Sequence, residues 1–219
     1  MADVAPEEET RRDKVINLGL PKSGTTTLGE ALKRAGYRVA DWKVKRKKSV
    51  GGLIYASYFQ GKDPLSRLRK FDAISQMDIV RDGSNMWPQT DYGLLMKIRE
   101  YHPTVKFLLS YRDAAALSDS MMRWSNLGRK RLKIHAIPGL PLGYGDKGHQ
   151  REKWINGHYM FVRKVFADDP NFLEYDITDP KAPEKISAFL GCDLPWWGRA
   201  NAGKTPAPVD EPLAKESDT

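Results

Sequence analysis

Residues 15–32, which read Val-Ile-Asn-Leu-Gly-Leu-Pro-Lys-Ser-Gly-Thr-Thr-Thr-Leu-Gly-Glu-Ala-Leu, constrain the fold more than any other part of the chain. An apolar strand comes first, a glycine-containing turn follows, and a helix begins near Thr26. This order directs several backbone N–H groups and the positive end of a helix dipole at one point, which suits a phosphate group. The segment therefore predicts a phosphate-binding turn within an α/β fold.

Short apolar runs and amphipathic stretches alternate along the rest of the chain. Strands are expected at residues 14–18, 37–40, 71–77, 105–111 and 172–175, and helices at 26–35, 91–101, 113–124, 150–166 and 182–190. This alternation predicts a single three-layer α/β domain of P-loop-like type, with a central parallel sheet covered by helices on both faces. Residues 42–53 and 128–148 break the alternation and are expected to form long loops.

Charge separates the two ends of the chain from its body. Residues 1–12 are expected to be an acidic flexible tail, 13–204 the domain, and 205–219 a flexible acidic tail. The net charge is +8 overall, but residues 10–204 carry +15, because the two ends are acidic. A body this basic attracts an anionic partner such as a phosphorylated co-substrate, an acidic substrate, nucleic acid or a membrane surface.

Several features favour a cytoplasmic protein. The chain has one cysteine, Cys192, which fits a reducing compartment. No apolar run approaches the roughly 18 residues of a membrane span, and the N-terminus has no apolar stretch typical of a secretory signal.

The turn differs from the Walker A loop of nucleotide-binding proteins. Gly19 and Gly24 are five residues apart, as in that loop, but Thr25 stands where its lysine is required and Lys22 lies inside the turn. Lys22 is therefore expected to lie alongside the bound group. An ordinary turn needs one hydroxyl to cap the helix that follows, whereas this turn contains four, on Ser23, Thr25, Thr26 and Thr27.

Residues 21–26, Pro-Lys-Ser-Gly-Thr-Thr, resemble the phosphosulfate loop of sulfotransferases that use 3′-phosphoadenosine 5′-phosphosulfate (PAPS). The family's second motif is an arginine at the end of a core strand and a serine eight residues later, and Arg112 and Ser120 have this spacing. Residues 172–176 and 189–195 also resemble the end of small bacterial-type sulfotransferase domains, so the resemblance runs from about residue 14 to 201.

The resemblance implies transfer of a sulfuryl group from PAPS to an acceptor hydroxyl or amine, with 3′,5′-adenosine bisphosphate (PAP) as product and no metal required. Lys22 is the implied catalytic residue that stabilises the bridging and leaving oxygens, and Arg112 with Ser120 binds the 3′-phosphate. The implied co-substrate-binding residues are Pro21, Lys22, Ser23, Gly24, Thr25, Thr26, Thr27, Arg112 and Ser120.

Two positions depart from the pattern of many cytosolic family members. Thr27 stands where they have the tryptophan that stacks on adenine, and residues 73–78, Ala-Ile-Ser-Gln-Met-Asp, lack their catalytic histidine. Asp78 is the predicted base, because it follows a strand at the edge where α/β sheets bind ligands. Asp82 and His135 are the alternatives. The alternative interpretation is that Asp78 is a turn residue or forms an ion pair with Arg81.

Two other classes of function stay open at this point. One is a P-loop nucleotide kinase or ATPase, and the other a non-catalytic module that binds a polyanion. The basic residues 43–48 fit a solvated loop better than a nucleic-acid site, so nucleic acid is not an expected partner. The four histidines lack metal-ligand spacing, which predicts no metal site. The acceptor, anionic or carbohydrate in our expectation, and the oligomeric state do not follow from the sequence.

Overall fold

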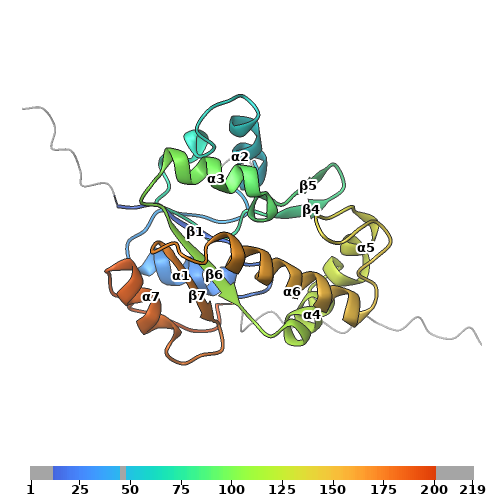
Figure 1. The fold of residues 1–219 in the computed structure, drawn as a ribbon. Helices are drawn as coiled ribbons and strands as arrows, with labels where there is room; N and C mark the ends of the chain where they lie inside the picture. The colour runs from blue at the N-terminus through green and yellow to red at the C-terminus, as the bar shows by residue number, and fades with distance from the viewer. Residues whose placement is uncertain (1–11, 45–47, 201–219) are drawn as a thin grey trace, which may run out of the picture.

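A computed structural model describes residues 12–44 and 48–200 of the chain. Its centre is a sheet of five strands in the order β2-β3-β1-β6-β7, in which every neighbouring pair is parallel (Figure 1). These strands are β1 (Val15–Asn17), β2 (Val39–Ala40), β3 (Ala73–Ile74), β6 (Lys106–Tyr111) and β7 (Phe172–Asp176). The predicted parallel sheet is confirmed, and its first strand lies in the middle.

Helices cover both faces of the sheet, so the predicted three-layer α/β architecture is confirmed as well (Figure 1). One face packs against α1 (Thr25–Arg34) and α7 (Ala182–Leu190). The other packs against α2 (Val50–Tyr58), α3 (Tyr92–Tyr101), α4 (Ala114–Arg123) and α6 (Gly148–Val165).

The strands read as near-continuous apolar runs because both of their faces are buried. Successive residues of β6 alternate between the two cores: Phe107 and Leu109 face the α6 side, and Leu108 faces the α1 side. The Phe107 ring lies 4.6 Å from that of Phe166, between centroids, and Phe107 is fully buried. Burial of a side chain of this size contributes roughly 1.5–3 kcal/mol.

The expected loop over residues 42–53 is wrong at its end, because α2 begins at Val50. Gly51 and Gly52 argue against a helix by propensity, but tertiary packing decides otherwise. A Cβ on Gly51 would lie 2.5 Å from the Met77 carbonyl oxygen, so this close contact needs a glycine. The Ser49 side chain also accepts a hydrogen bond from the Gly52 amide and caps the helix.

The expected strand over 71–77 is shorter than predicted, and a hairpin follows it. Only Ala73–Ile74 pairs within the sheet, and β4 (Ile79–Arg81) and β5 (Ser84–Met86) then form an antiparallel ribbon. The ribbon projects beside α5 (Leu132–Ile134) in Figure 1. The loop expected over 128–148 is also wrong at its start, since a π-helical turn, η4 (Leu127–Arg131), leads directly into α5. Short 3₁₀ turns, η2 (Ser66–Leu68) and η3 (Pro88–Thr90), complete the described elements.

The predicted tails fall almost wholly on residues 1–11 and 201–219, which lie outside the described residues, as do residues 45–47 of the basic run. Arg12 is described and packs on the domain, with its guanidinium 4.8 Å from the centroid of the Tyr37 ring. Among the helices of the described ranges, none has the length and apolar character needed to cross a membrane.

Candidate active site

The chain leaves β1 at Asn17 and turns into α1 through residues 18–24, which we call the phosphate loop. Lys22 (φ 75°) and Gly24 (φ 103°) adopt the left-handed conformation. Gly24 needs this freedom and has no room for a side chain, since a Cβ would lie 2.5 Å from Ile177 Cδ1. A lysine in this conformation is uncommon, and such strain is typical of functional turns.

The N-terminus of α1 differs from those of α2, α3 and α4. Ser49, Asp91 and Asp113 cap these three helices through side-chain hydrogen bonds. Within the described residues no side chain caps α1. The hydroxyl groups of the loop therefore do not serve as helix caps, and the first N–H groups of α1 remain available to a bound anion.

Ser23 lies beneath the loop rather than in the cavity. Its buried hydroxyl is 2.7 Å from the Leu20 carbonyl oxygen, to which it donates, and 2.6 Å from Ser110 Oγ on β6. Its side chain is thus fully occupied in fixing the loop to the sheet, so only its backbone could contribute to binding.

The three threonines that begin α1, Thr25, Thr26 and Thr27, line one cavity. Thr26 is exposed there. Thr25 Oγ1 donates to Gln76 Oε1 at 3.1 Å, and Thr27 Oγ1 donates to the Gly198 carbonyl oxygen at 3.0 Å. Thr27 therefore fixes the segment after α7 across the start of α1, and Trp197 of that segment also lines the cavity.

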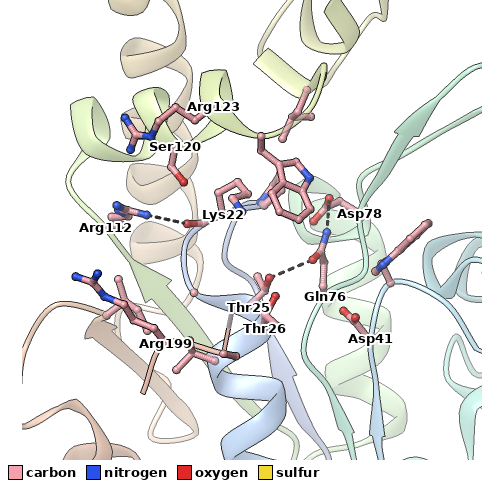
Figure 2. Close-up of a pocket in the computed structure, with 18 of the residues that line it drawn as sticks. Lys22, Thr25, Thr26, Asp41, Gln76, Asp78, Arg112, Ser120, Arg123 and Arg199 are labelled. Atoms are coloured by element: carbon pink, nitrogen blue, oxygen red, sulfur yellow. Dashed lines mark hydrogen bonds between the residues drawn. The ribbon is translucent and has the colours of Figure 1, made fainter. Parts of the chain in front are cut away.

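Lys22 lies at the centre of the cavity in Figure 2. Its ammonium group is 3.6 Å from the centroid of the Trp124 ring, a cation–π contact. Burial lowers the pKa of Lys22, and the positive charge of Arg112 lowers it further. Because both effects make the charged ammonium unfavourable, binding of an anion beside Lys22 would stabilise it.

Arg112 follows β6 and lies on one side of Lys22 (Figure 2). Its Nη1 donates to the Lys22 carbonyl oxygen at 3.4 Å, whereas its buried Nε has no partner among the described residues. Tyr159 of α6 fixes its backbone, because the Tyr159 hydroxyl donates to the Arg112 carbonyl oxygen at 3.0 Å and accepts from its amide at 3.2 Å. Ser120 and Arg123 of α4 line the cavity on this same side.

Asp78 lies on the opposite side of Lys22 and is 3% exposed. It accepts hydrogen bonds from Gln76 Nε2 and Gln89 Nε2, both at 3.1 Å. No ion pair with Arg81 occurs in the described part of the chain. Burial raises the pKa of Asp78 to about 7, and the two amide hydrogen bonds oppose this rise only in part. The carboxyl can therefore exchange a proton near neutral pH.

The two alternative bases lie away from the cavity. Asp82 is 94% exposed and faces His135, with 3.5 Å between Oδ1 and Nε2. Neither residue lines the cavity, whereas Pro21, Gly24, Asp78, Arg112 and Ser120 all do. Sequence reasoning missed Gln76, Gln89 and Trp124, since amides and aromatic rings at such spacings carry no distinctive pattern.

The cavity that joins these residues has a volume of about 1180 Å³ and lies at the carboxyl ends of the sheet strands. Arg81, Arg123, Arg131 and Arg199 add positive charge to its wall, and Asp41 and Asp179 are carboxylates of the lining besides Asp78. Within residues 12–44 and 48–200, no three His, Cys, Asp or Glu side chains are grouped so as to hold a metal ion.

Comparison with known proteins gives a family and a fold. Residues 14–141 match the sulfotransferase domain family. Twenty-one chains of solved structures match, among them mouse sulfotransferase SULT7A1 complexed with PAP, with a TM-score of 0.50 and 19% identity. That match covers 83% of this chain but 58% of the mouse chain, so this chain spans less than two thirds of its relative. No curated protein matches the sequence. The phosphate loop, the parallel sheet and the family match together show that the chain belongs to the sulfotransferase domain family.

Proposed function

We propose that this protein transfers a sulfuryl group from PAPS to a hydroxyl or amine of an acceptor. The observation that carries the proposal is the arrangement about Lys22. The N-terminus of α1, which no side chain of the described residues caps, and Arg112, whose buried Nε has no partner among them, line the cavity, and the buried carboxyl of Asp78 lies across Lys22 from Arg112 (Figure 2).

The residues present fit PAPS in chemistry and in space. Arg112, whose Nε has no partner among the described residues, and the Ser120 hydroxyl suit the 3′-phosphate, and the α1 N-terminus with Thr25 and Thr26 suits the 5′-phosphosulfate. A cavity of about 1180 Å³ exceeds the roughly 300–1,000 Å³ of an ordinary small-molecule site, which supports room for two substrates. Trp197, held near the loop through the Thr27–Gly198 hydrogen bond, is our candidate for the wall against adenine.

Lys22 and Asp78 would divide the chemistry between them. Asp78 takes the proton of the acceptor hydroxyl while the acceptor oxygen bonds to sulfur in line with the breaking bond to the bridging oxygen. Lys22 and the N–H groups of α1 neutralise the charge that grows on the leaving oxygens of PAP. To reach the leaving oxygens, the Lys22 ammonium would move away from the Trp124 ring.

Two earlier alternatives find less support. A kinase or ATPase loop requires a lysine where Thr25 stands. A polyanion-binding module does not account for a carboxyl as deeply buried as Asp78 inside the cavity. The single cysteine supports a cytoplasmic site of action, which we also propose.

Ligand-induced stabilisation tests the function directly. We expect PAP at about 100 times its Kd to raise the free energy of unfolding by about 2.7 kcal/mol, because it binds only the folded protein. ATP with Mg²⁺ should stabilise far less, and transfer from PAPS should release PAP in the presence of a suitable acceptor. Stabilisation by ATP–Mg²⁺ in preference to PAP would favour the kinase alternative.

Replacement of Lys22 tests the leaving-group role. Lys22→Ala should lower kcat by about 100-fold or more, as loss of one oxyanion donor does, and leave the fold intact. Lys43→Ala is the matched control. The Lys43 ammonium also stacks on a tryptophan, 3.8 Å from the centroid of the Trp42 ring, but Lys43 does not line the cavity. Retention of more than about a tenth of wild-type turnover by Lys22→Ala contradicts the assignment.

Replacement of Arg112 tests recognition of the 3′-phosphate. Lysine keeps the charge but loses the two-pronged geometry of the guanidinium. Arg112→Lys should therefore weaken binding of PAP far more than binding of adenosine 5′-monophosphate, which lacks the 3′-phosphate. Calorimetry with both nucleotides measures the two losses, and equal losses would refute the role.

Replacement of Asp78 tests the base. Asp78→Asn should slow transfer by about 100-fold or more with PAP affinity near that of wild type. In the wild type, turnover should rise as the pH increases through about 7, where the Asp78 carboxyl loses its proton. Asp82→Asn, which changes an exposed carboxylate, is the matched control. Normal turnover by Asp78→Asn would remove Asp78 from the mechanism.

The same variant has a second, independent readout in stability. Because the pKa of Asp78 is about 7 in the folded protein against 3.8 normally, the folded state binds its proton more tightly. The resulting stabilisation is complete below pH about 4 and is lost as the pH rises through 7. The melting temperature of Asp78→Asn, compared with that of the wild type, should therefore rise as the pH increases from 5 to 8, by the equivalent of a few kcal/mol. A constant difference across this range would show that Asp78 has an ordinary pKa.

A further inference from the structure

Arg131 lies on the Asp78 side of the cavity and is unused by the reaction described so far. It belongs to η4, and its Nη1 donates to the Val80 carbonyl oxygen at 3.0 Å. Val80 is two residues beyond Asp78 in the chain, so this bond fixes the guanidinium close to the proposed base. The buried Nε of Arg131 has no hydrogen-bond partner among the described residues.

No carboxylate of the described residues forms an ion pair with Arg131. Burial lowers the pKa of Arg131, and the charge of Asp78 opposes this effect only from a distance. A buried N–H without a partner and a partly desolvated charge both cost free energy in the free protein. A bound anion would remove both costs at once.

Arg112 offers an internal comparison. Arg112 and Arg131 are the two arginines of the described residues whose Nε is buried without a partner, and both line the same cavity. Lys22 separates Arg112 from Asp78 in Figure 2, so a nucleotide that spans Arg112 and Lys22 leaves the Asp78 side to the acceptor. Arg131 therefore resembles Arg112 in its buried Nε, which has no partner among the described residues, but it lies on the side of the cavity that is left to the acceptor.

The surroundings of Arg131 are largely apolar and aromatic. Val80, to which Arg131 is bonded, its neighbour Ile79 and Leu127 of the same helical turn line the cavity, as do Trp42 and Trp124. Arg81, which is exposed, adds a second positive charge, and Asp41, whose charge acts on Asp78, adds a negative one. Such a wall suits an apolar body that carries one acidic group.

We propose that the acceptor is a small hydroxylated organic acid whose carboxylate binds Arg131 while its hydroxyl lies at Asp78. The proposal rests on the sulfotransferase function proposed above and makes Arg131 the residue that determines acceptor specificity. A guanidinium can bind a carboxylate through two parallel hydrogen bonds, which positions the hydroxyl as well as attracting the acid.

Matched pairs of acids and neutral esters test this proposal. The probes are phloretate with methyl phloretate, and ω-hydroxyhexanoate with its methyl ester, each titrated by calorimetry into the protein saturated with PAP. In the wild type each acid should bind about tenfold or more tightly than its ester, as expected for a charge-assisted hydrogen bond. Turnover of each pair with PAPS, followed by release of PAP, should show the same preference in kcat/KM.

Arg131→Gln should abolish the preference for the acid and leave PAP affinity unchanged. Arg129→Gln is the matched control, because Arg129 belongs to the same helical turn but is exposed and does not line the cavity. Should Arg131→Gln fail to fold, Arg131→Lys, which keeps the charge, should retain only part of the preference.

Three results would overturn the proposal: equal binding of acid and ester by the wild type, binding of neither, or a preference that Arg131→Gln retains. A fall in PAP affinity in Arg131→Gln would also overturn it, since Arg131 would then serve the nucleotide. Failure of the wild type to bind PAP is a separate result that refutes the proposed function itself.

Discussion

Gly19 packs so closely against β6 that an added Cβ would lie 1.9 Å from Ser110 Oγ. Around this contact, the buried hydroxyls of Ser23 and Ser110 meet at 2.6 Å. Asn17 Oδ1 accepts from the amides of Gly19 and Ser110, and its Nδ2 donates to the Ser75 carbonyl oxygen. Three strands and the phosphate loop are thereby fixed to one another. The strained conformation of Lys22 persists because the loop has no freedom to relax.

Helix α6 supports the other side of the site through its buried polar side chains. His158 Nε2 lies 2.8 Å from the Leu18 carbonyl oxygen at the start of the loop, and Tyr159 holds the backbone of Arg112. Burial lowers the pKa of His158 to about 4, so this imidazole is neutral at physiological pH and its bond to the loop does not depend on titration near pH 7. Buried polar groups here bind backbone and so position the residues that face the cavity.

Local patterns made the parallel sheet and the strand–turn–helix around Lys22 predictable, whereas tertiary contacts account for what was missed. The loop around Lys22 follows from glycine spacing and strand–helix order, and Asp78 follows from its place after a strand. Helix α2 was missed because Gly51 is required by a contact with Met77, 26 residues away, that propensity cannot register. Burial leaves the Arg131 Nε without a partner among the described residues, and the sequence cannot show this, because there Arg131 is one of several neighbouring basic residues.

The hydrogen bond from Thr27 to the Gly198 carbonyl oxygen joins residues 171 positions apart. During synthesis the phosphate loop leaves the ribosome early, but β1 then lacks its neighbour β6, whose residues follow about 90 positions later. The wall that contains Trp197 arrives last of all. A nascent chain therefore cannot complete this cavity until residues 197 and 198 have been translated and can pack across the start of α1.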